Sequence, residues 1–388
     1  MISIYHMLFM RLSAIIFALL IIASSSFSQM GIRFNGNEII HLYYALKASG
    51  EESLKKGKYE DAVNLFRQAL ILSRESEQRN EEIACYMSLG LLYWNLGQLN
   101  ESLDHYDRAH SLAKKFNLLA EKHESMIFMK IFNLYKEGKK YRSSGQYQES
   151  VRSFQKAIHL AKKIKSREHE VKCLRQLSIT YWNLNDLNQF FSLNEKALKI
   201  AQFINHKKEE ARCLINIGVY YFKKDNYSKA LHYYQAALKI IQELSDNKNE
   251  ESILITNISM IYNYIGDYDE TLSYLKRALA IDHQIKNNHY ICKDLNIIGW
   301  TYRIKGQKTG NKEDLYNALD YFLKCLRLAK EIKDDKTEIE VINNIGTVYS
   351  DLKEHDKALH YFQIGYEKAE KANDVEALGM ILNNMGIV

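Results

Sequence analysis

The stretch Ile342–Tyr349, INNIGTVY, with KALHYF at residues 357–362 just after it, returns in modified form along most of the chain. In most copies a small residue stands three positions before a tyrosine, a position that holds Ser53 in the first copy and lies beyond Val388 in the last, and an alanine and an aromatic residue usually follow a short turn. The small residues lie 40 or 41 residues apart, except for two intervals of 48 and 47. They are Gly50, Gly90, Gly138, Ser178, Gly218, Ser259, Gly299, Gly346 and Gly386. This regular spacing indicates a repeat architecture.

Each repeat is predicted to be two amphipathic helices joined by a short turn. Apolar and small residues recur at helical spacing in segments such as GKYEDAVNLFRQAL (57–70) and GDYDETLSYLKRAL (266–279). The 388 residues include no proline and only 17 glycines, so the strongest helix breakers are rare. One hairpin cannot cover its own apolar face, so neighbouring hairpins must stack into a solenoid. The sequence therefore predicts an all-α fold.

The repeats resemble the tetratricopeptide repeat family. Its pattern of Leu-Gly-x-x-Tyr, then Ala, an aromatic residue and Ala, is matched from Leu46 to Val388. The usual repeat has about 34 residues and often a closing proline. The longer spacing here is similar to that of kinesin light chains and bacterial peptide-sensing regulators. The resemblance implies a right-handed superhelical solenoid of antiparallel helix pairs, with a concave groove lined by the first helix of each pair.

Residues 1–28 are predicted to be a signal peptide. Arg11 precedes the twelve-residue apolar run Leu12–Ala23, and four serines follow before Gln29. Cleavage near Ser28 and Gln29 would export the chain to the periplasm or cell envelope. The alternative is an uncleaved membrane anchor, although the run is shorter than the roughly 20 residues of a spanning helix. We expect a linker at 29–37 and, at 38–388, eight helical hairpins with an incomplete ninth.

Three segments depart from the regular repeat. The extra residues around KKFNLLAEKHESM (114–126) are expected to lengthen the flanking helices. Those of GQKTGNKEDLYNALDYF (306–322) are expected to form a polar loop. The ninth unit stops at Val388, where we expect an uncovered apolar face and a fragment of a longer protein. Its exposed residues would be Leu378, Ile381, Leu382 and Met385.

No motif in the sequence indicates catalysis, a cofactor or a metal site. Histidines lack the His-Glu-x-x-His spacing of zinc enzymes, and no phosphate-binding glycine loop occurs. Acidic residues at 266–270 and 334–336 are interpreted as helix caps. The net charge of +6 is too modest to indicate nucleic acid. The sequence predicts a protein that is not an enzyme and has no small-molecule substrate; an enzymatic role would need a pocket that the sequence does not indicate.

The cysteines are expected to be thiols. Cys85, Cys173 and Cys213 each stand five residues before the small residue of their repeat, which predicts three buried thiols about one helix-packing distance of ~10 Å apart. A disulfide requires Cα atoms within about 7 Å. Cys292 and Cys325 lie in the two helices of one repeat and would meet only if their side chains converge.

The predicted ligand contacts follow from the family resemblance, which places them on the first helix around the small residue. Two positions before it stand mainly carboxamides, which can both donate to and accept from a peptide backbone. These residues are Gln176, Asn216, Asn257, Asn344 and Asn384, with Ser88 at the same position in the second repeat. The alternative is that each carboxamide bonds only the neighbouring first helix.

Basic residues share the same helices and favour an acidic or C-terminal carboxylate ligand. They are Lys139, Arg142, Lys172, Arg175, Arg212, Lys223, Lys293 and Arg303. The alternative is a solvated helix face. Trp94, Trp182 and Trp300 are candidate anchors for a ligand, or else core residues.

Two functions remain open from the sequence. The first is an exported, non-enzymatic scaffold that binds an extended protein segment or peptide in its concave groove. The second is the sensory region of a truncated bacterial signalling protein whose output domain would be a histidine kinase or a DNA-binding regulator. An uncleaved signal would add a membrane tether to either.

Overall fold

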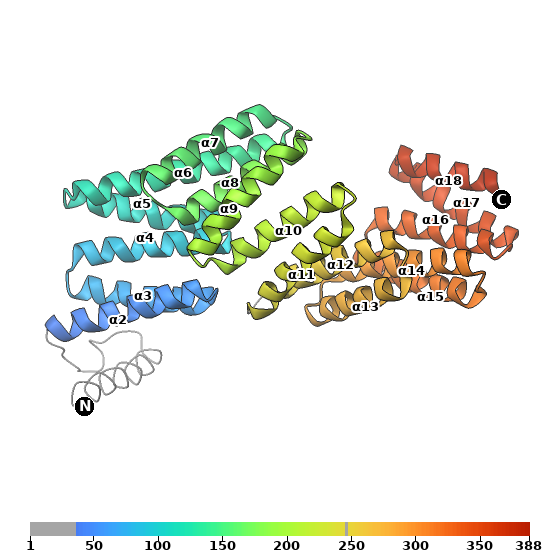
Figure 1. Ribbon diagram of the computed structural model, residues 1–388, viewed down its shortest axis with the longest axis horizontal. Helices are drawn as coiled ribbons and strands as arrows, with labels where there is room; N and C mark the ends of the chain where they lie inside the picture. The colour runs from blue at the N-terminus through green and yellow to red at the C-terminus, as the bar shows by residue number, and fades with distance from the viewer. Residues whose placement is uncertain (1–35, 245–246) are drawn as a thin grey trace. The chain divides into compact units, whose positions relative to one another are not determined.

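The computed structural model describes residues 36–244 and 247–388, and this part of the chain is built from helices without a strand. The predicted signal peptide (1–28) and most of the predicted linker (29–37) lie outside the described residues. The chain divides into two compact units, an N-terminal unit of residues 1–213 and a C-terminal unit of residues 214–388. The division falls within helix α10 (Figure 1).

The helices follow one another as antiparallel hairpins. Those of the N-terminal unit are α2 (Gly36–Lys55), α3 (Tyr59–Glu75), α4 (Arg79–Leu96), α5 (Leu99–Lys115), α6 (Leu119–Ser143), α7 (Tyr147–Lys163), α8 (Arg167–Asn183), α9 (Leu187–Phe203) and the start of α10 (Lys207–Lys223). Those of the C-terminal unit are the rest of α10, α11 (Tyr227–Glu243), α12 (Lys248–Ile265), α13 (Tyr268–Gln284), α14 (Asn288–Thr309), α15 (Lys312–Ile332), α16 (Asp335–Asp351), α17 (His355–Ala372) and α18 (Val375–Ile387).

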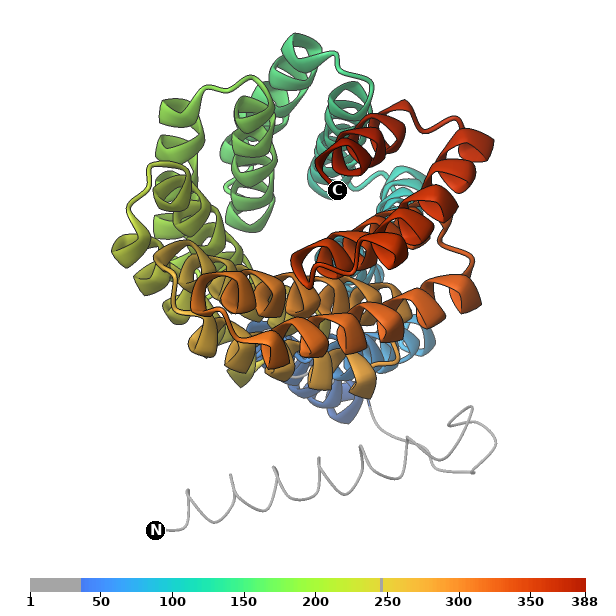
Figure 2. The same cartoon turned by 90° about the vertical axis from the view of Figure 1, so that its right-hand side faces the viewer.

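Within each unit a helix packs mainly on the helices before and after it. The even-numbered helices are the first helices of the hairpins, and α6 touches α8, α14 touches α16, and α16 touches α18. In the C-terminal unit, Figure 2 shows the hairpins from α12 to α18 laid one after another (orange to red). First helices therefore lie next to first helices, as a stacked-hairpin solenoid requires.

The small residue of each repeat is needed because an aromatic ring of the second helix lies directly on it. A Cβ atom added at Gly90 would stand 2.7 Å from Tyr106, and one added at Gly138 would stand 2.8 Å from Phe154. Real Cβ atoms do not approach so closely without displacing their neighbours. The predicted close approach of the two helices is therefore confirmed.

In the two repeats that have a serine in place of the glycine, the facing residue of the second helix is not an aromatic ring. Sixteen residues after Ser178 and Ser259, where five of the glycine repeats have an aromatic ring, stand Asn194 and Leu275. Both side chains are fully buried. A smaller second-helix residue leaves room for the serine side chain, so the two positions vary together within this one chain.

Among the described residues, most turns between helices are short and contain one left-handed residue. At the end of α4, Gly97 has a φ of 81°, its N–H donates to the carbonyl of Trp94 at 3.2 Å, and the N–H of Gln98 donates to that of Tyr93 at 2.9 Å. This is the Schellman arrangement, which ends a helix without proline. In residues 36–244 and 247–388, ten turns use a non-glycine residue at positive φ, mostly Asn or Lys.

The acidic residues at 266–270 and 334–336 cap helices, as predicted. Asp267 accepts the N–H of Glu270 at 3.1 Å at the start of α13, and Asp334 accepts the N–H of Thr337 at 3.1 Å at the start of α16. These bonds satisfy amide groups that the first turn of a helix leaves unpaired.

The two long repeats differ in how the structure uses the added residues. Helix α6 has 25 residues, so the predicted lengthening is confirmed for it, whereas α5, the other flanking helix, keeps the 17 residues that α7 also has, and for α5 the prediction is wrong. The polar loop predicted at 306–322 is wrong: α14 and α15 reach 22 and 21 residues and are separated only by Gly310 and Asn311. Without proline, Gln307, Lys308 and Thr309 continue α14, and Leu315 packs against Gly306.

Helix α18 covers the last hairpin on one side only. Ile381 is 1% exposed and packs against the core, contrary to the prediction, whereas Leu382 is 54% exposed and Met380 is 50% exposed. Among the described residues, none of the helices combines the length and the apolar composition needed to cross a bilayer.

Candidate binding groove in the N-terminal unit

One face of α4 lines two neighbouring cavities of the N-terminal unit. The first has a volume of about 340 Å³, and its α4 residues recur at helical spacing. Helix α6 and one residue of α5 form the opposite wall. The lining residues are Asn80, Ile83, Ala84, Met87, Ser88 and Leu91 of α4, Tyr106 of α5, and Glu121, Glu124 and Phe128 of α6.

The second cavity, of about 300 Å³, lies between segments far apart in the sequence. Helices α2, α3 and α4 form one side, and α8 with the turn between α9 and α10 forms the other. The lining residues are Glu51 and Leu54 of α2, Phe66 of α3, Ser88, Leu91 and Asn95 of α4, Glu168 of α8, and Ile204, Asn205 and His206 of the turn. Ser88 and Leu91 belong to both cavities, which together we call the α4 groove.

An aromatic cluster built around His169 supports the groove from behind. His169 is 1% exposed, and its ring packs against Trp94, Tyr106 and Phe128 at centroid distances of 4.9–6.3 Å. Burial and the nearby Lys172 lower the pKa of His169 to about 3, so the ring is neutral. Its Nδ1 atom lies 2.8 Å from Oγ of Ser166. The histidine is thus a core residue.

A buried charge cluster joins α8 to α10 beside these aromatic residues. Glu209 is fully buried and pairs with Arg175 at 2.7 Å and with Arg212 at 2.9 Å. Burial alone would raise the pKa of Glu209, but the two guanidinium groups hold it well below its usual range. Lys172 is 4% exposed and donates to the carbonyl of Trp94 at 2.8 Å. Burial lowers the pKa of Lys172 to about 7.

The structure brings five of the predicted basic residues together in the N-terminal unit, on α6, α8 and α10. Arg142 donates to the side chain of Gln176 at 2.7 Å and to its carbonyl at 3.0 Å. Lys139 is exposed, and partial burial with Arg142 and Arg175 lowers its pKa. Lys139 therefore offers the most accessible positive charge of the group, which is Lys139, Arg142, Lys172, Arg175 and Arg212.

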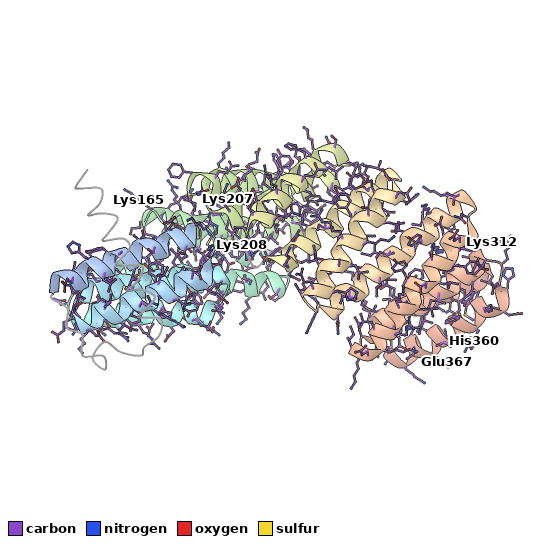
Figure 3. The ribbon with its side chains drawn as sticks, turned by 90° about the horizontal axis from the view of Figure 1, so that it is seen from below. Lys165, Lys207, Lys208, Lys312, His360 and Glu367 are labelled. Atoms are coloured by element: carbon purple, nitrogen blue, oxygen red, sulfur yellow. The ribbon has the colours of Figure 1, made fainter. Side chains whose placement is uncertain are left out.

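Further lysines stand at the hairpin turns on the edge of the same unit. Figure 3 labels Lys165 in the turn before α8 and Lys207 and Lys208 at the start of α10. Lys207 pairs with Glu210 at 2.9 Å, and Nζ of Lys208 lies 5.8 Å from the ring centroid of Tyr59. These lysines belong to the turns and not to the cavity walls.

The predicted carboxamides use part of their hydrogen-bonding capacity within the protein. Asn344 is 5% exposed and donates to Asn296 at 3.0 Å, and Asn384 donates to Asn343 at 2.9 Å. Gln176 is 7% exposed and accepts from Arg142. Asn216 and Asn257 are half-buried on α10 and α12. A carboxamide has two donors and an acceptor, so these bonds leave capacity for a ligand only where the group remains accessible.

The remaining predicted residues of the C-terminal unit are spread over separate places. Arg303 forms an ion pair with Asp351 at 2.5 Å, while Lys293 and Lys223 are exposed.

Of the three predicted tryptophans, Trp94 is 2% exposed and Trp182 is half-buried against Phe190. Trp300 is 40% exposed, with the Arg303 guanidinium 5.2 Å from its ring centroid.

The five cysteines are buried thiols, and the predicted core positions of Cys85, Cys173 and Cys213 are confirmed. Cys292 and Cys325 do converge, with their Sγ atoms 3.2 Å apart. In residues 36–244 and 247–388 there is no cluster of three His, Cys, Asp or Glu side chains that would hold a metal ion.

Five polar residues of the second cavity were not found from the sequence: Glu51, Asn95, Glu168, Asn205 and His206. They occupy unlike positions in their repeats, so no column of similar residues marks them. Only the fold brings the first hairpin to the start of α10, more than 150 residues later. Ser88 is the exception. The sequence placed it in the register of the predicted ligand contacts, and in the structure it lines both cavities.

Comparison with known families identifies the repeat itself. Tetratricopeptide repeat models match residues 53–115, 211–243, 254–284 and 339–363. Among curated proteins, none matches the sequence.

Solved structures share the fold at low sequence identity. A signal transduction ATPase (STAND) protein with a tetratricopeptide repeat sensor, from Pyrococcus horikoshii, superposes with a TM-score of 0.56 and 15% identity over 89% of this chain. The match spans half of that protein. BtubC (BKLC) from P. vanneervenii superposes with a TM-score of 0.51 and 16% identity, over 59% of this chain and 92% of its own. These similarities confirm a helical repeat fold of the tetratricopeptide type.

Proposed function

Because the chain is built of tetratricopeptide repeats, we propose that it is a non-enzymatic module that binds an extended segment of a partner protein in the α4 groove. One observation carries the proposal. Two cavities adjoin along one face of α4, a first helix, and share Ser88 and Leu91. Ser88 stands two positions before Gly90, in the register where the family resemblance places ligand contacts.

The lining of the groove suits a peptide. About half of the residues that line it are apolar, with Ile83, Met87, Leu91 and Phe128 among them, and polar and acidic groups stand between these side chains. Ligand sites combine an apolar lining with a small number of placed polar groups in this way. Two adjoining cavities accept successive side chains of an extended chain, whereas a compact small molecule would need only one.

The charge of the partner is proposed from the basic group on α6, α8 and α10. Arg142, Arg175 and Arg212 have partners within the protein, which leaves Lys139 as the exposed cation. We propose that an acidic side chain or a C-terminal carboxylate of the segment lies near Lys139. Such a contact would act on the association rate and the salt dependence more than on affinity.

Binding is tested with a mixture of fluorescein-labelled random nonapeptides and the purified chain, measured by anisotropy. Ser88→Phe should fill the shared part of the groove and reduce binding by about tenfold or more, as loss of a central contact does. The matched control is Ser111→Phe, at an exposed position of the second helix α5. Equal binding by both variants, with unchanged circular dichroism, would place the partner elsewhere.

Export is proposed from the sequence of residues 1–28 and is tested by fractionating cells that express the full chain. Recovery of the intact N-terminus in the cytoplasm would contradict it.

In the alternative function the repeats are the sensory region of a signalling protein. That role would use the same groove, so the nonapeptide experiment bears on both.

A further inference from the structure

The second cavity of the α4 groove contains two polar atoms without a partner in the described structure. Asn95 is 5% exposed, and its Oδ1 atom accepts no hydrogen bond. The Nε2 atom of His206 is buried and also unbonded. Both residues line the cavity. An unpaired buried polar group costs about 1–3 kcal/mol, so a ligand that bonds to two such groups at one cavity gains from both.

We propose that this cavity is a subsite for one arginine side chain of the bound segment. The proposal rests on the proposed function and adds the chemistry of one partner residue. The cavity of about 300 Å³ is at the small end of ligand pockets, which range over about 300–1,000 Å³. It therefore takes a single long side chain better than a folded surface.

The proton positions at the cavity follow from the bonds already made. Nδ1 of His206 accepts the N–H of Glu209 at 3.4 Å, at the start of α10. In the neutral ring the proton therefore stands on Nε2, which becomes a donor. Asn95 contributes an acceptor. The cavity thus offers one donor and one acceptor, and a peptide unit next to the arginine can supply a carbonyl for His206.

The acceptors and charges of the cavity favour a cation. Glu51 of α2 and Glu168 of α8 both line it. Lys172 is an opposing charge close to the cavity, since it donates to the carbonyl of Trp94, the residue before Asn95. Burial lowers the pKa of Lys172 to about 7, which reduces its positive charge and therefore its repulsion of a bound cation. Lys208 extends toward the ring of Tyr59.

A guanidinium group fits these acceptors better than an ammonium group. It has five N–H donors in a planar fork, which can serve two carboxylates and one amide oxygen together. It also keeps its charge when desolvated, whereas a buried lysine loses its proton readily. The aliphatic stem of the arginine would pack on Leu54, Phe66 and Ile204, which form the apolar part of the wall.

The test uses a positional-scanning set of nonapeptides in which one position at a time is fixed as Arg, Lys, citrulline or Glu. Citrulline has nearly the shape of arginine without its charge. At one position Arg should bind about tenfold tighter than citrulline, because citrulline cannot form charge-assisted hydrogen bonds with Glu51, which is exposed, or with Glu168, which is half-buried. The variant Glu51→Gln with Glu168→Gln should remove this preference, and so should Asn95→Leu.

The matched control is Glu101→Gln with Glu195→Gln, two exposed residues of α5 and α9. This variant should keep the arginine preference. Four results would overturn the subsite. Three concern the native chain: citrulline binds as tightly as Arg, Lys binds as tightly as Arg, or Glu is preferred. The fourth is an arginine preference that survives the Glu51 and Glu168 changes. If peptides bind and Ser88→Phe abolishes binding, such a result removes only the arginine subsite. If no peptide of any set binds, the proposed function fails as well.

Discussion

The ring of Phe362 lies on Gly346 so closely that a Cβ atom at position 346 would stand 2.6 Å from Cε1 of Phe362. We therefore expect Gly346→Ala to lower the free energy of unfolding by about 1–2 kcal/mol. Overpacking a core costs about 1–3 kcal/mol, and alanine returns up to about 1 kcal/mol through its higher helix propensity. Urea denaturation followed by circular dichroism measures the change.

Two further variants separate this contact from a general effect of alanine. Phe362→Leu reproduces the pairing of Ser259 with Leu275, so the cost of Gly346→Ala should largely disappear in that background. Gly379→Ala, in α18 with open space around it, should not destabilise the chain. Additive effects of the Gly346 and Phe362 changes would contradict the contact, because residues that touch are expected to couple by about 0.5–3 kcal/mol.

A second prediction concerns Cys292 and Cys325, whose Sγ atoms lie 3.2 Å apart between α14 and α15. Oxidised glutathione should join them in a disulfide with loss of two hydrogen atoms, the glutathione being reduced. The hydrogen bond from Cys325 lowers the pKa of Cys292, which favours it as the attacking thiolate. Peptide mass spectrometry after alkylation checks the link, and closing this loop should stabilise the C-terminal unit by about 3–4 kcal/mol.

The comparison variants for this bond are Cys292→Ser, which should abolish it, and Cys85→Ser, which should leave it intact. Cys85 is 1% exposed in the N-terminal unit and has no role in the predicted bond. Failure of the native chain to cross-link, while the chain unfolded in urea does so, would show that the burial of the two thiols prevents the reaction.

The repeated features of the fold could be predicted from the sequence because each depends on local spacing. Gly346 and Phe362 are sixteen residues apart in one hairpin, and the same separation recurs from repeat to repeat. The polar residues in the segment at 306–322 are compatible with a loop and with an exposed helix, so the sequence alone does not distinguish the two. The packing of Leu315 on Gly306 is a contact between the two extended helices.

The candidate site could be predicted only where it follows the repeat. Ser88 was placed by its register, whereas Asn95 and His206 line one cavity because the fold brings α4 close to the turn before α10. The hydrogen bond between Asn344 and Asn296 also depends on which residues neighbouring first helices present. A column of carboxamides in the sequence cannot distinguish binding to a ligand from binding to the next helix.

A third prediction concerns the fully buried carboxylate of Glu209. Glu209→Gln leaves the guanidinium groups of Arg175 and Arg212 without their anion, and side-chain exposures of 13% and 31% give them little water. Breaking a buried ion pair from one side costs about 3–5 kcal/mol, and the partial exposure of Arg212 favours the lower figure. Thermal unfolding measures the loss.

Glu210→Gln is the matched control on the same helix. Glu210 is 8% exposed, but its partner Lys207 has a side chain that is 41% exposed and can be hydrated when the carboxylate is lost, so this substitution should cost less than Glu209→Gln, about 1 kcal/mol. Similar losses for Glu209→Gln and Glu210→Gln would mean that the two guanidinium groups paired with Glu209 contribute no more to stability than one half-exposed lysine.

The final prediction is a pH dependence set by Asp282 of α13 and Asp294 of α14, which are 0% and 1% exposed. Burial and the neighbouring Asp282 raise the pKa of Asp294 to about 7, and burial raises that of Asp282. The folded chain therefore holds a proton that the unfolded chain releases near pH 4. Stability should be greatest below pH 4 as far as this pair is concerned, and should fall as the pH rises toward 7.

Urea midpoints between pH 4 and 8 measure this dependence. The free energy of unfolding should change by at most about 4 kcal/mol, since each pKa unit corresponds to about 1.4 kcal/mol. Asp294→Asn keeps an acceptor for the hydroxyl of Thr256, which donates to Asp294 at 3.3 Å, and removes one titrating group. It should flatten the profile and stabilise the chain at pH 8. Asp335→Asn, at an exposed position of α16, should leave the slope unchanged. A wild-type profile that already rises from pH 4 to 7 would contradict the shared proton, because two ionised carboxylates would then have to be stable side by side in the core.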